Sequence, residues 1–280
     1  MKYYSIVVLL LLISCSSRPE IDEESYQLVL KSDTALMERN LNEALSLVNK
    51  AIEIDKNNYI AYNNLGYVKL FLDYPNNEVL EAFKKSYDLN NDYLVGLYSL
   101  TNCYFEYKDY KNTIKFGSRY LDKISNKGNL LVQESQILAV IGESYNYLLE
   151  YSKAEEYLTK SIQIEPNIAT RYKERGIARK NLGNEVNALN DFNKAIFLDS
   201  LYHQAYNSIA IYFEKLEMAE EALINYNKAI DLEPNSSIYL LNRAKFLIEK
   251  GNIEQACLDI EKSDSLGNKE AKEYREKYCN

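Results

Sequence analysis

The residues of this chain that could do chemistry are few and lie far apart. It has one histidine, His203, and none of its 41 Asp and Glu residues stands in a recognisable acid–base pair. Neither the phosphate-binding pattern G-x-x-x-x-G-K nor the nucleophile pattern G-x-S-x-G occurs. A lone histidine cannot supply a histidine-based zinc site or a triad, and no Cys-x-x-Cys accompanies it. The sequence therefore predicts no catalytic centre, no metal site and no cofactor.

Two arginines stand out because each occupies a position that is apolar at the matching places of the chain. Asp191 follows Arg175 by 16 residues, and Asp259 follows Arg243 by the same 16. A buried guanidinium needs a counter-charge, since leaving it unpaired is costly. The spacing favours two structural Arg–Asp ion pairs, and an anion-binding arginine is the alternative.

The cysteines divide into one near the amino terminus and three within the helical part. Cys103 is expected to be a small buried hydrophobe. A turn around 266–268 separates Cys257 from Cys279, so antiparallel helices could bring their thiols together. A disulfide needs Cα atoms within about 7 Å. The sequence leaves a bridged and a reduced pair equally open.

The first residues look like an export signal. Lys2 precedes the apolar run 6–13, which is too short for a permanent span of about 20 residues. The run Leu12-Ile13-Ser14-Cys15 resembles the bacterial lipobox. That resemblance implies cleavage before Cys15, lipidation of its thiol and a lipoprotein signal peptide over 1–14. An ordinary cleaved signal with a chance cysteine is the alternative. Residues 15–24 are polar and acidic, and we expect a tether.

The elements that must position all these side chains repeat every 34 residues. With only 9 Gly and 4 Pro, the chain has few helix breakers, and apolar residues recur three or four apart, which predicts helices. A net charge of -8 and a pI near 5.0 argue against nucleic acid as a partner. The members of the series that keep the step are Gly142, Gly176, Ala210, Ala244; Ala154, Ala188, Ala222, Ala256; and Ser161, Ala195, Ala229, Ser263.

Each period contains two apolar helical segments separated by a short polar break, which is the pattern of a helical hairpin. Its best copy, with Tyr206, Phe213, Ala222, Tyr226 and Pro234, resembles the tetratricopeptide repeat family. The resemblance implies an all-α fold, an α-solenoid of about seven hairpins plus a capping helix over 271–280. The expected hairpins span 25–58, 59–93, 94–134, 135–168, 169–202, 203–236 and 237–270.

The third hairpin departs most from the pattern. Gly117 and Tyr120 stand where an aromatic and a small residue are usual, and about seven extra residues lie near 128–134. We expect its second helix to pack differently. In the hairpin 203–236, Ile209 and Asn225 replace the arginine and the aspartate together, which supports the ion-pair interpretation.

In the resembled family, the first helices of the hairpins form a concave face that binds peptides. The residues of this chain that the resemblance places there include the candidate groove residues Asn63, Tyr67, Tyr98, Asn102, Lys173, Asn207 and Lys245. Ordinary solvated helix surface is the alternative for each. Co-chaperone members hold a C-terminal carboxylate with a set of Lys, Asn and Arg that these positions do not reproduce.

The sequence thus predicts a non-enzymatic scaffold, anchored by lipid to a bacterial cell-envelope membrane, that binds a protein or peptide on its concave face. No nucleic acid and no small-molecule substrate is expected, and the membrane is contacted through the anchor only. One alternative is a soluble cytoplasmic adaptor, co-chaperone-like. Another is a lipoprotein enzyme with its site in the irregular segment 121–134, which offers no nucleophile–base pair.

Overall fold

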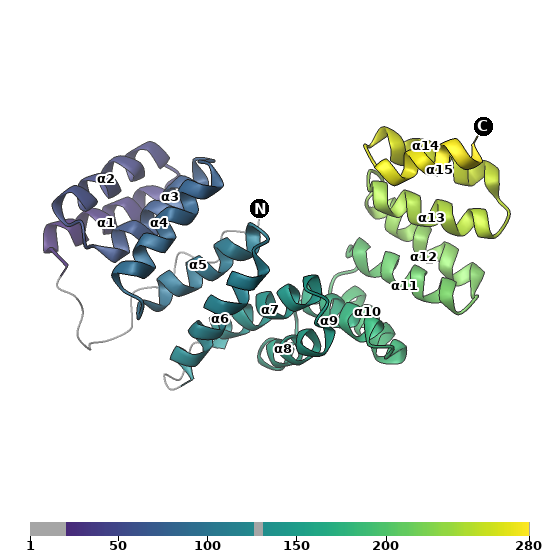
Figure 1. Ribbon diagram of the computed structural model, residues 1–280, viewed down its shortest axis with the longest axis horizontal. Coiled ribbons are helices and arrows are strands. Elements are labelled where there is room, and N and C mark those ends of the chain that lie inside the picture. The colour runs from purple at the N-terminus through teal and green to yellow at the C-terminus, as the bar shows by residue number, and fades with distance from the viewer. Residues whose placement is uncertain (1–20, 126–130, 280) are drawn as a thin grey trace. The chain divides into compact units, whose positions relative to one another are not determined.

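A computed structural model describes residues 21–125 and 131–279 of the chain. The expected signal peptide and Cys15 lie outside this range. Within it the chain forms fifteen α-helices and no strand, which confirms the all-α repeat fold (Figure 1). The helices are α1 Glu23–Met37, α2 Leu41–Ile54, α3 Tyr59–Phe71, α4 Asn76–Leu89, α5 Leu94–Glu106, α6 Tyr110–Ile124, α7 Leu131–Tyr147, α8 Tyr151–Ile164, α9 Ala169–Asn181, α10 Glu185–Leu198, α11 His203–Lys215, α12 Ala219–Leu232, α13 Ser237–Glu249, α14 Ile253–Ser265 and α15 Lys269–Tyr278.

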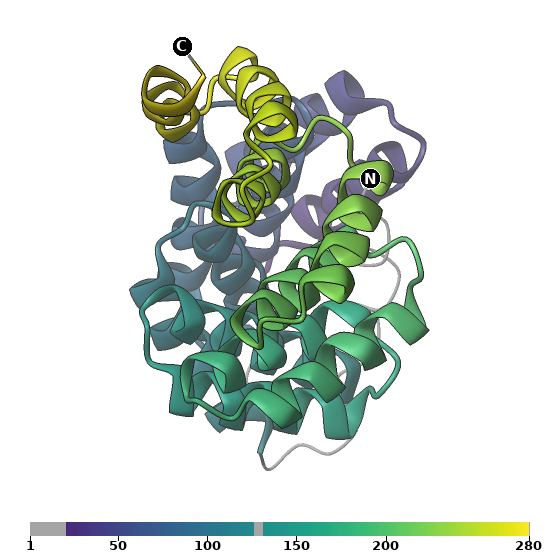
Figure 2. The same cartoon turned by 90° about the vertical axis from the view of Figure 1, so that its right-hand side faces the viewer.

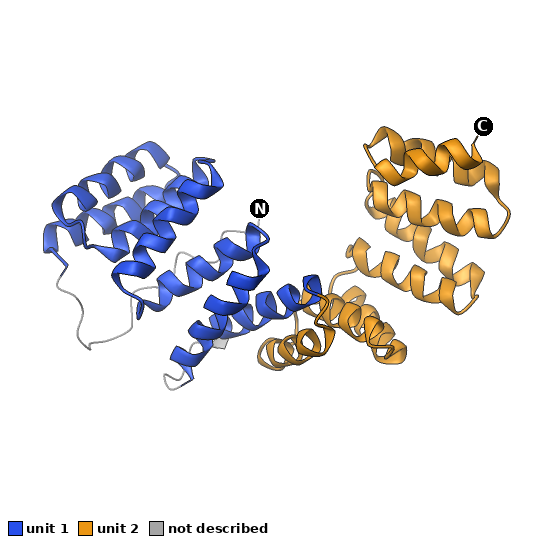
Figure 3. Cartoon of the chain, in the orientation of Figure 1, with its two compact units in different colours: residues 1–148 blue, residues 149–280 orange. Residues whose placement is uncertain are grey.

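The chain divides into two compact units, residues 1–148 and 149–280 (Figure 3). In unit 1 the hairpins α1/α2, α3/α4 and α5/α6 are followed by α7. In unit 2, α8 is followed by the hairpins α9/α10, α11/α12 and α13/α14 and by α15. The expected hairpin 135–168 is therefore shared between the units, since α7 ends the first and α8 begins the second.

In the turn between the two helices of a hairpin, one residue adopts a left-handed backbone conformation, and it stands at the same repeat position in different hairpins. Gly183 and Gly251 occupy it with φ of 78° and 79°. Arg39 and Glu217 occupy it in other hairpins with φ of 64° and 58°. Glycine adopts this conformation without steric cost, and it commonly ends a helix. The turn is therefore set by its place in the repeat, and the residue type is secondary.

Small residues let the two helices of a hairpin approach closely. A Cβ added to Gly66 on α3 would lie 2.5 Å from a ring carbon of Phe83 on α4. In unit 2, a Cβ on Gly176 would lie 2.6 Å from the ring of Phe192. Both phenylalanines are fully buried, so neither ring has room to move away. The small residues of the repeat are core.

The third hairpin packs in its own way. Gly117 on α6 sits against Ile141 of α7, where an added Cβ would come within 2.9 Å of that side chain. Tyr120 is buried beside Tyr98, with ring centroids 6.0 Å apart. A small residue and an aromatic have thus exchanged places on the second helix.

The ends of the helical stack differ from expectation by two residues each. The expected tether reaches residue 24, but α1 begins at Glu23 because Asp22 caps it, accepting a 3.0 Å hydrogen bond from the Ser25 amide. Likewise α15 begins at Lys269 because the side chain of Asn268 caps it.

The last helix is tied to the one before it. Figures 1 and 2 both show α15 lying alongside α14 at the end of the chain. Cys257 on α14 and Cys279 form a disulfide, with their Cα atoms 5.5 Å apart. Cys103 is a buried free thiol. No helix in 21–125 or 131–279 combines the length and the apolar character that crossing a membrane requires.

Candidate partner-binding surface

The two arginines singled out by their spacing each hold an aspartate with two hydrogen bonds. Arg175 donates from Nε and Nη2 to Asp191 at 2.9 and 2.7 Å. Arg243 donates from the same two atoms to Asp259 at 2.8 and 2.7 Å. Such two-point pairing matches the fork of the guanidinium to the carboxylate. The structure thus brings these four residues together in pairs, each between the two helices of one hairpin.

Each guanidinium also reaches back to the second helix of the preceding hairpin. Arg175 Nη1 donates to Thr159 Oγ1 on α8 at 3.3 Å. Arg243 Nη1 donates to Asn227 Oδ1 on α12 at 2.7 Å. Each arginine therefore joins three helices, and most of its donors are used inside the protein. Sequence reasoning missed this third helix, although the acceptor lies 16 residues before the arginine just as the aspartate lies 16 after it.

In unit 1, hydrogen bonds between neighbouring first helices form a polar ladder. Ser32 on α1 lies 2.8 Å from Oδ1 of Asn64 on α3, and the Asn64 amide donates to Asp33. Further along, Tyr67 on α3 and Ser99 on α5 share a 2.8 Å hydrogen bond between their hydroxyl groups. The last rung runs from the Tyr98 hydroxyl to Gln136 on α7. These bonds connect residues 31 to 38 positions apart, which is about one repeat.

Burial in the polar ladder changes two ionisation equilibria. It raises the pKa of Asp33 from its usual 3.8 to about 6, against the opposing effect of the Asn64 hydrogen bond. It also raises the pKa of Tyr67, whose hydroxyl is held neutral and bonded to Ser99. Desolvation disfavours the charged form of an acid in both cases. The polar ladder is therefore essentially uncharged in mild acid, and Asp33 gains charge as pH rises through 6.

Four of the seven expected groove residues lie in or beside the polar ladder of unit 1. Tyr67 and Tyr98 bridge neighbouring helices, and Asn102 donates a 2.8 Å hydrogen bond to the Tyr98 carbonyl oxygen. Asn63 is buried, and within the described residues its Oδ1 has no hydrogen-bond partner. Tyr67 and Tyr98 thus connect neighbouring first helices, whereas Asn102 bonds within its own helix and Asn63 is buried.

The three expected groove residues of unit 2 also have partners within the chain. Lys173 pairs with Glu174, and Asn207 accepts a 3.1 Å hydrogen bond from the Asn242 amide. Lys245 lies 2.6 Å from Glu270 and 5.2 Å from the centre of the Tyr274 ring. A ligand that bound the Lys173 or Lys245 ammonium, or Oδ1 of Asn207, would compete with these partners.

Three of the four first helices of unit 1 end in an exposed apolar side chain, which was not predicted from the sequence, and the fourth, α5, ends in the exposed Glu106. We call Met37, Phe71 and Tyr147 the apolar rim. Each is exposed in the last turn of a first helix, and the Tyr147 ring stacks on Tyr110 at 4.4 Å. Phe71 stands four residues after Tyr67, one helical turn along the same face. That spacing is the signal that could have found the apolar rim.

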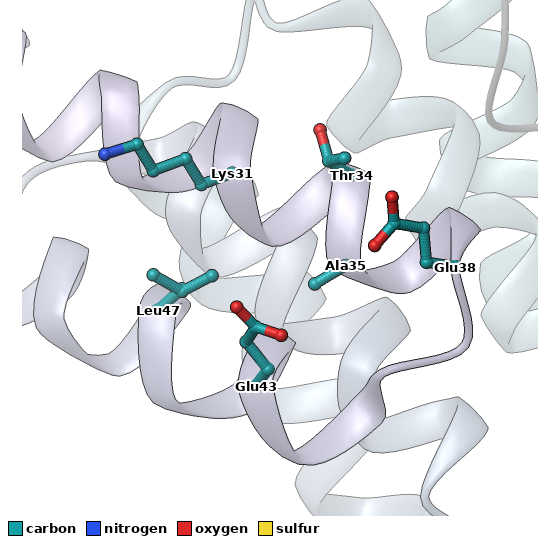
Figure 4. A pocket seen from close by; sticks show the side chains of 6 residues that line it. All are labelled: Lys31, Thr34, Ala35, Glu38, Glu43 and Leu47. Carbon is teal, nitrogen blue, oxygen red and sulfur yellow. The ribbon is translucent and has the colours of Figure 1, made fainter.

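No arrangement suited to catalysis appears in the described part of the chain. His203 Nδ1 lies 2.8 Å from the Tyr239 hydroxyl, and no group of three His, Cys, Asp or Glu side chains there could hold a metal. Figure 4 shows a shallow depression of about 240 Å³ between α1 and α2, in which Lys31 extends away from Glu38 and Glu43. Two solvated carboxylates without a nucleophile or a base partner make no catalytic pair.

Comparison with known proteins finds the same helical repeats in this chain. A family model of the tetratricopeptide repeat matches residues 135–168 and 203–236, and a second one matches 225–257. The chain carries tetratricopeptide repeats. A TPR repeat-containing protein of Methanocaldococcus jannaschii is 31% identical over 210 residues, which cover 71% of this chain and 34% of that protein. The chain thus spans about a third of that relative's length.

Solved structures share the TPR fold at lower identity. A tetratricopeptide repeat protein from Parabacteroides merdae superposes with a TM-score of 0.69 at 20% identity, covering 92% of this chain and all of that one. The TPR protein YrrB, described as having an unusual peptide-binding site, superposes with a TM-score of 0.55 at 22% identity. That match covers 69% of this chain and 95% of YrrB. TPR proteins generally serve as scaffolds for protein–protein interaction, so this repeat architecture indicates such a role.

Proposed function

We propose that this chain is a non-enzymatic scaffold of the bacterial cell envelope, anchored to a membrane by lipid on Cys15. It binds an extended segment of a protein partner along the first helices of unit 1. The observation that carries the binding proposal is the apolar rim of Met37, Phe71 and Tyr147. Exposed apolar side chains set beside a rigid polar framework are typical of peptide-recognition surfaces.

In the proposed groove, the residues expected from the resemblance position the binding surface, and other residues contact the partner. Tyr67 and Tyr98 hold the first helices in register and thereby position the rim. Affinity comes from burying the exposed Met37 and Phe71 under apolar side chains of the partner. Rigid support of a binding surface lowers the entropy lost on association.

Two observations support export and anchoring. The run Leu12-Ile13-Ser14-Cys15 resembles a lipobox at the depth where a signal peptidase would cut. The disulfide between Cys257 and Cys279 suits an oxidising compartment, because such bonds are rare in the cytosol. The alternative is a cytoplasmic adaptor. The disulfide does not favour that alternative, because the cytosol keeps thiols reduced.

The anchor is tested by replacing Cys15 with Ala in the full chain. The variant should leave the membrane fraction, and mass spectrometry of the wild-type protein should find an acylated Cys15 at the mature amino terminus. Cys103→Ala is the control, because Cys103 is a free thiol that takes no part in anchoring or in the disulfide. A wild-type protein that keeps an unmodified Met1 would support the adaptor and refute the anchor.

Partner binding is tested by photocrosslinking in intact cells. A benzoylphenylalanine placed at residue 71 should capture a discrete partner, and Met37→Asp should reduce that capture at least tenfold. Ile224→Asp on α12 of unit 2 is the control, since it adds the same charge at another exposed apolar residue. Equal capture by the two variants would refute binding at the apolar rim.

A further inference from the structure

The outer surface of α10 carries a stripe unlike that of the other second helices in unit 2. The stripe consists of Val186, Asn190, Asn193 and Phe197, whose spacing of four, three and four residues places them on one face. All four side chains are exposed, Val186 by 69% and Phe197 by 79%. Leu201, just beyond the helix, is exposed by 68%. We call these four helical residues the α10 stripe.

The α10 stripe bears no charge, whereas the same repeat positions elsewhere in unit 2 do. Each of the other three second helices has at least one carboxylate there. The corresponding residues are Ser152, Glu156, Thr159 and Gln163 on α8; Glu220, Ile224, Asn227 and Asp231 on α12; and Glu254, Leu258, Glu261 and Ser265 on α14. In a chain of net charge -8, the α10 stripe is an uncharged ridge with an apolar residue at each end. Lys194 Nζ of the same helix lies 4.8 Å from the centre of the Phe197 ring, so a partner that packs on this ring must share or displace that contact.

The repeat position of Asn193 carries a hydrogen-bond acceptor for an arginine in two other second helices of unit 2. Thr159 and Asn227, at the repeat position of Asn193, accept hydrogen bonds from Arg175 and Arg243 of the following hairpin. The residue that follows Asn193 by the same 16 positions is Ile209, which has no donor. Asn193 therefore has no arginine to bind, and its side chain is exposed, as is that of Asn190.

We propose that the α10 stripe is a homodimer interface, in which it packs antiparallel against the same stripe of a second copy. A two-fold axis crossing α10 midway between Asp191 and Phe192 makes Val186 of one protomer face Phe197 of its partner. The same axis makes Asn190 of one protomer face Asn193 of its partner. Each apolar end then meets an apolar end, and each amide meets an amide that can exchange hydrogen bonds with it.

This self-complementarity favours a second copy over the other possible occupants. A two-fold interface must use one patch on both protomers, and the order apolar–amide–amide–apolar reads the same in both directions. Immersion in a lipid surface would bury Asn190 and Asn193 without partners, which is costly. Because none of the four positions is charged, no like charges of the stripe meet across the axis.

The oligomeric state of the full chain in density-matched detergent tests the proposal by sedimentation equilibrium. Wild type should dimerise, and Phe197→Asp should raise the dimer dissociation constant at least tenfold. Ile224→Asp on α12 is the matched control, since Ile224 is 58% exposed on an outer ridge as well, and it should leave the constant unchanged. A monomeric wild type, or equal effects of the two variants, would overturn the interface.

The antiparallel register is tested by two charge variants at solvent-exposed helix positions, where Glu and Lys are good helix formers. Asn190→Glu with Asn193→Glu sets carboxylates against carboxylates across the axis and should give monomers. Asn190→Glu with Asn193→Lys sets opposite charges together and should retain the dimer. Identical behaviour of the two double variants would refute the register. If the chain is monomeric and Phe197→Asp instead weakens flotation of Cys15→Ala protein with lipid vesicles, the stripe binds lipid and the proposal is wrong.

Discussion

The clearest energetic consequence of the structure concerns Arg243 and Asp259. Asp259→Asn removes the counter-charge of a guanidinium whose side chain is only 17% exposed. Breaking a buried pair by changing one partner costs about 3–5 kcal/mol, because the other charge stays buried and uncompensated. Asparagine keeps one acceptor oxygen for the arginine, so we expect the low end, about 3 kcal/mol.

The chain itself supplies the compensating change. In the hairpin α11/α12, Ile209 and Asn225 stand at the places of the arginine and the aspartate, and Ile209 is buried. Arg243→Ile combined with Asp259→Asn copies that arrangement into α13 and α14. Replacing both members of a buried ion pair is often close to neutral, so the double variant should lie within about 1 kcal/mol of wild type.

Native-state hydrogen exchange is the appropriate assay, because a helical stack can open one repeat at a time. A loss of about 3 kcal/mol corresponds to exchange roughly 150-fold faster, and we expect it in α13 and α14. Amides of α1 in unit 1 serve as the internal control and should not change. The reasoning is refuted if the single variant exchanges like wild type, or if the double variant is as unstable as the single one.

Three further predictions follow from particular contacts. Cys279→Ser should lower the local stability of α14 and α15 by about 3 kcal/mol, because the unfolded chain regains the entropy of a loop of this length. Hydrogen exchange of wild type and variant under oxidising conditions measures this loss. Equal exchange rates would mean that packing alone holds α15. Asp33→Asn should remove a pH dependence of the unfolding free energy. Because burial raises the pKa of Asp33 from 3.8 to about 6 in the folded state, this group stabilises the fold most below pH 4, and the contribution is lost as pH rises through 6. The wild-type minus variant difference in unfolding free energy should therefore shift by up to about 3 kcal/mol between pH 4 and pH 7, and a flat difference would contradict the burial of Asp33. Gly66→Ala should cost about 1–3 kcal/mol by urea unfolding, because the new Cβ would lie 2.5 Å from the Phe83 ring, and Phe83→Leu in the same chain should recover part of it.

Much of the architecture could be predicted because the information is local and repeated. Apolar residues three or four apart, small residues at a fixed step of 34 and polar breaks between them indicate helical hairpins without any long-range contact. The pairing of Arg175 with Asp191 was accessible for the same reason, since both lie in one hairpin whose geometry is set by the period. The sequence left the disulfide open because its formation depends on how α15 returns along α14.

The roles of individual surface residues could not be predicted in the same way. Asn63, Tyr67 and Tyr98 occupy positions that the family resemblance assigns to a groove. In the structure Asn63 is buried, and the two tyrosines bond to neighbouring first helices. The exposed apolar surface lies one turn further on, at Met37 and Phe71. A side chain on a first helix can contact a ligand only if no residue of the next hairpin is long enough and polar enough to bond to it.

The sequence by itself determined that this protein is a series of helical hairpins and which small and large residues meet inside each one. Only the tertiary structure decided that each arginine joins three helices, that the hairpin 135–168 is shared between two compact units, and that the α10 stripe is exposed. The physical reason is distance along the chain. A hairpin forms between segments a few residues apart, whereas burial and pairing on its outer faces depend on neighbours a full repeat away.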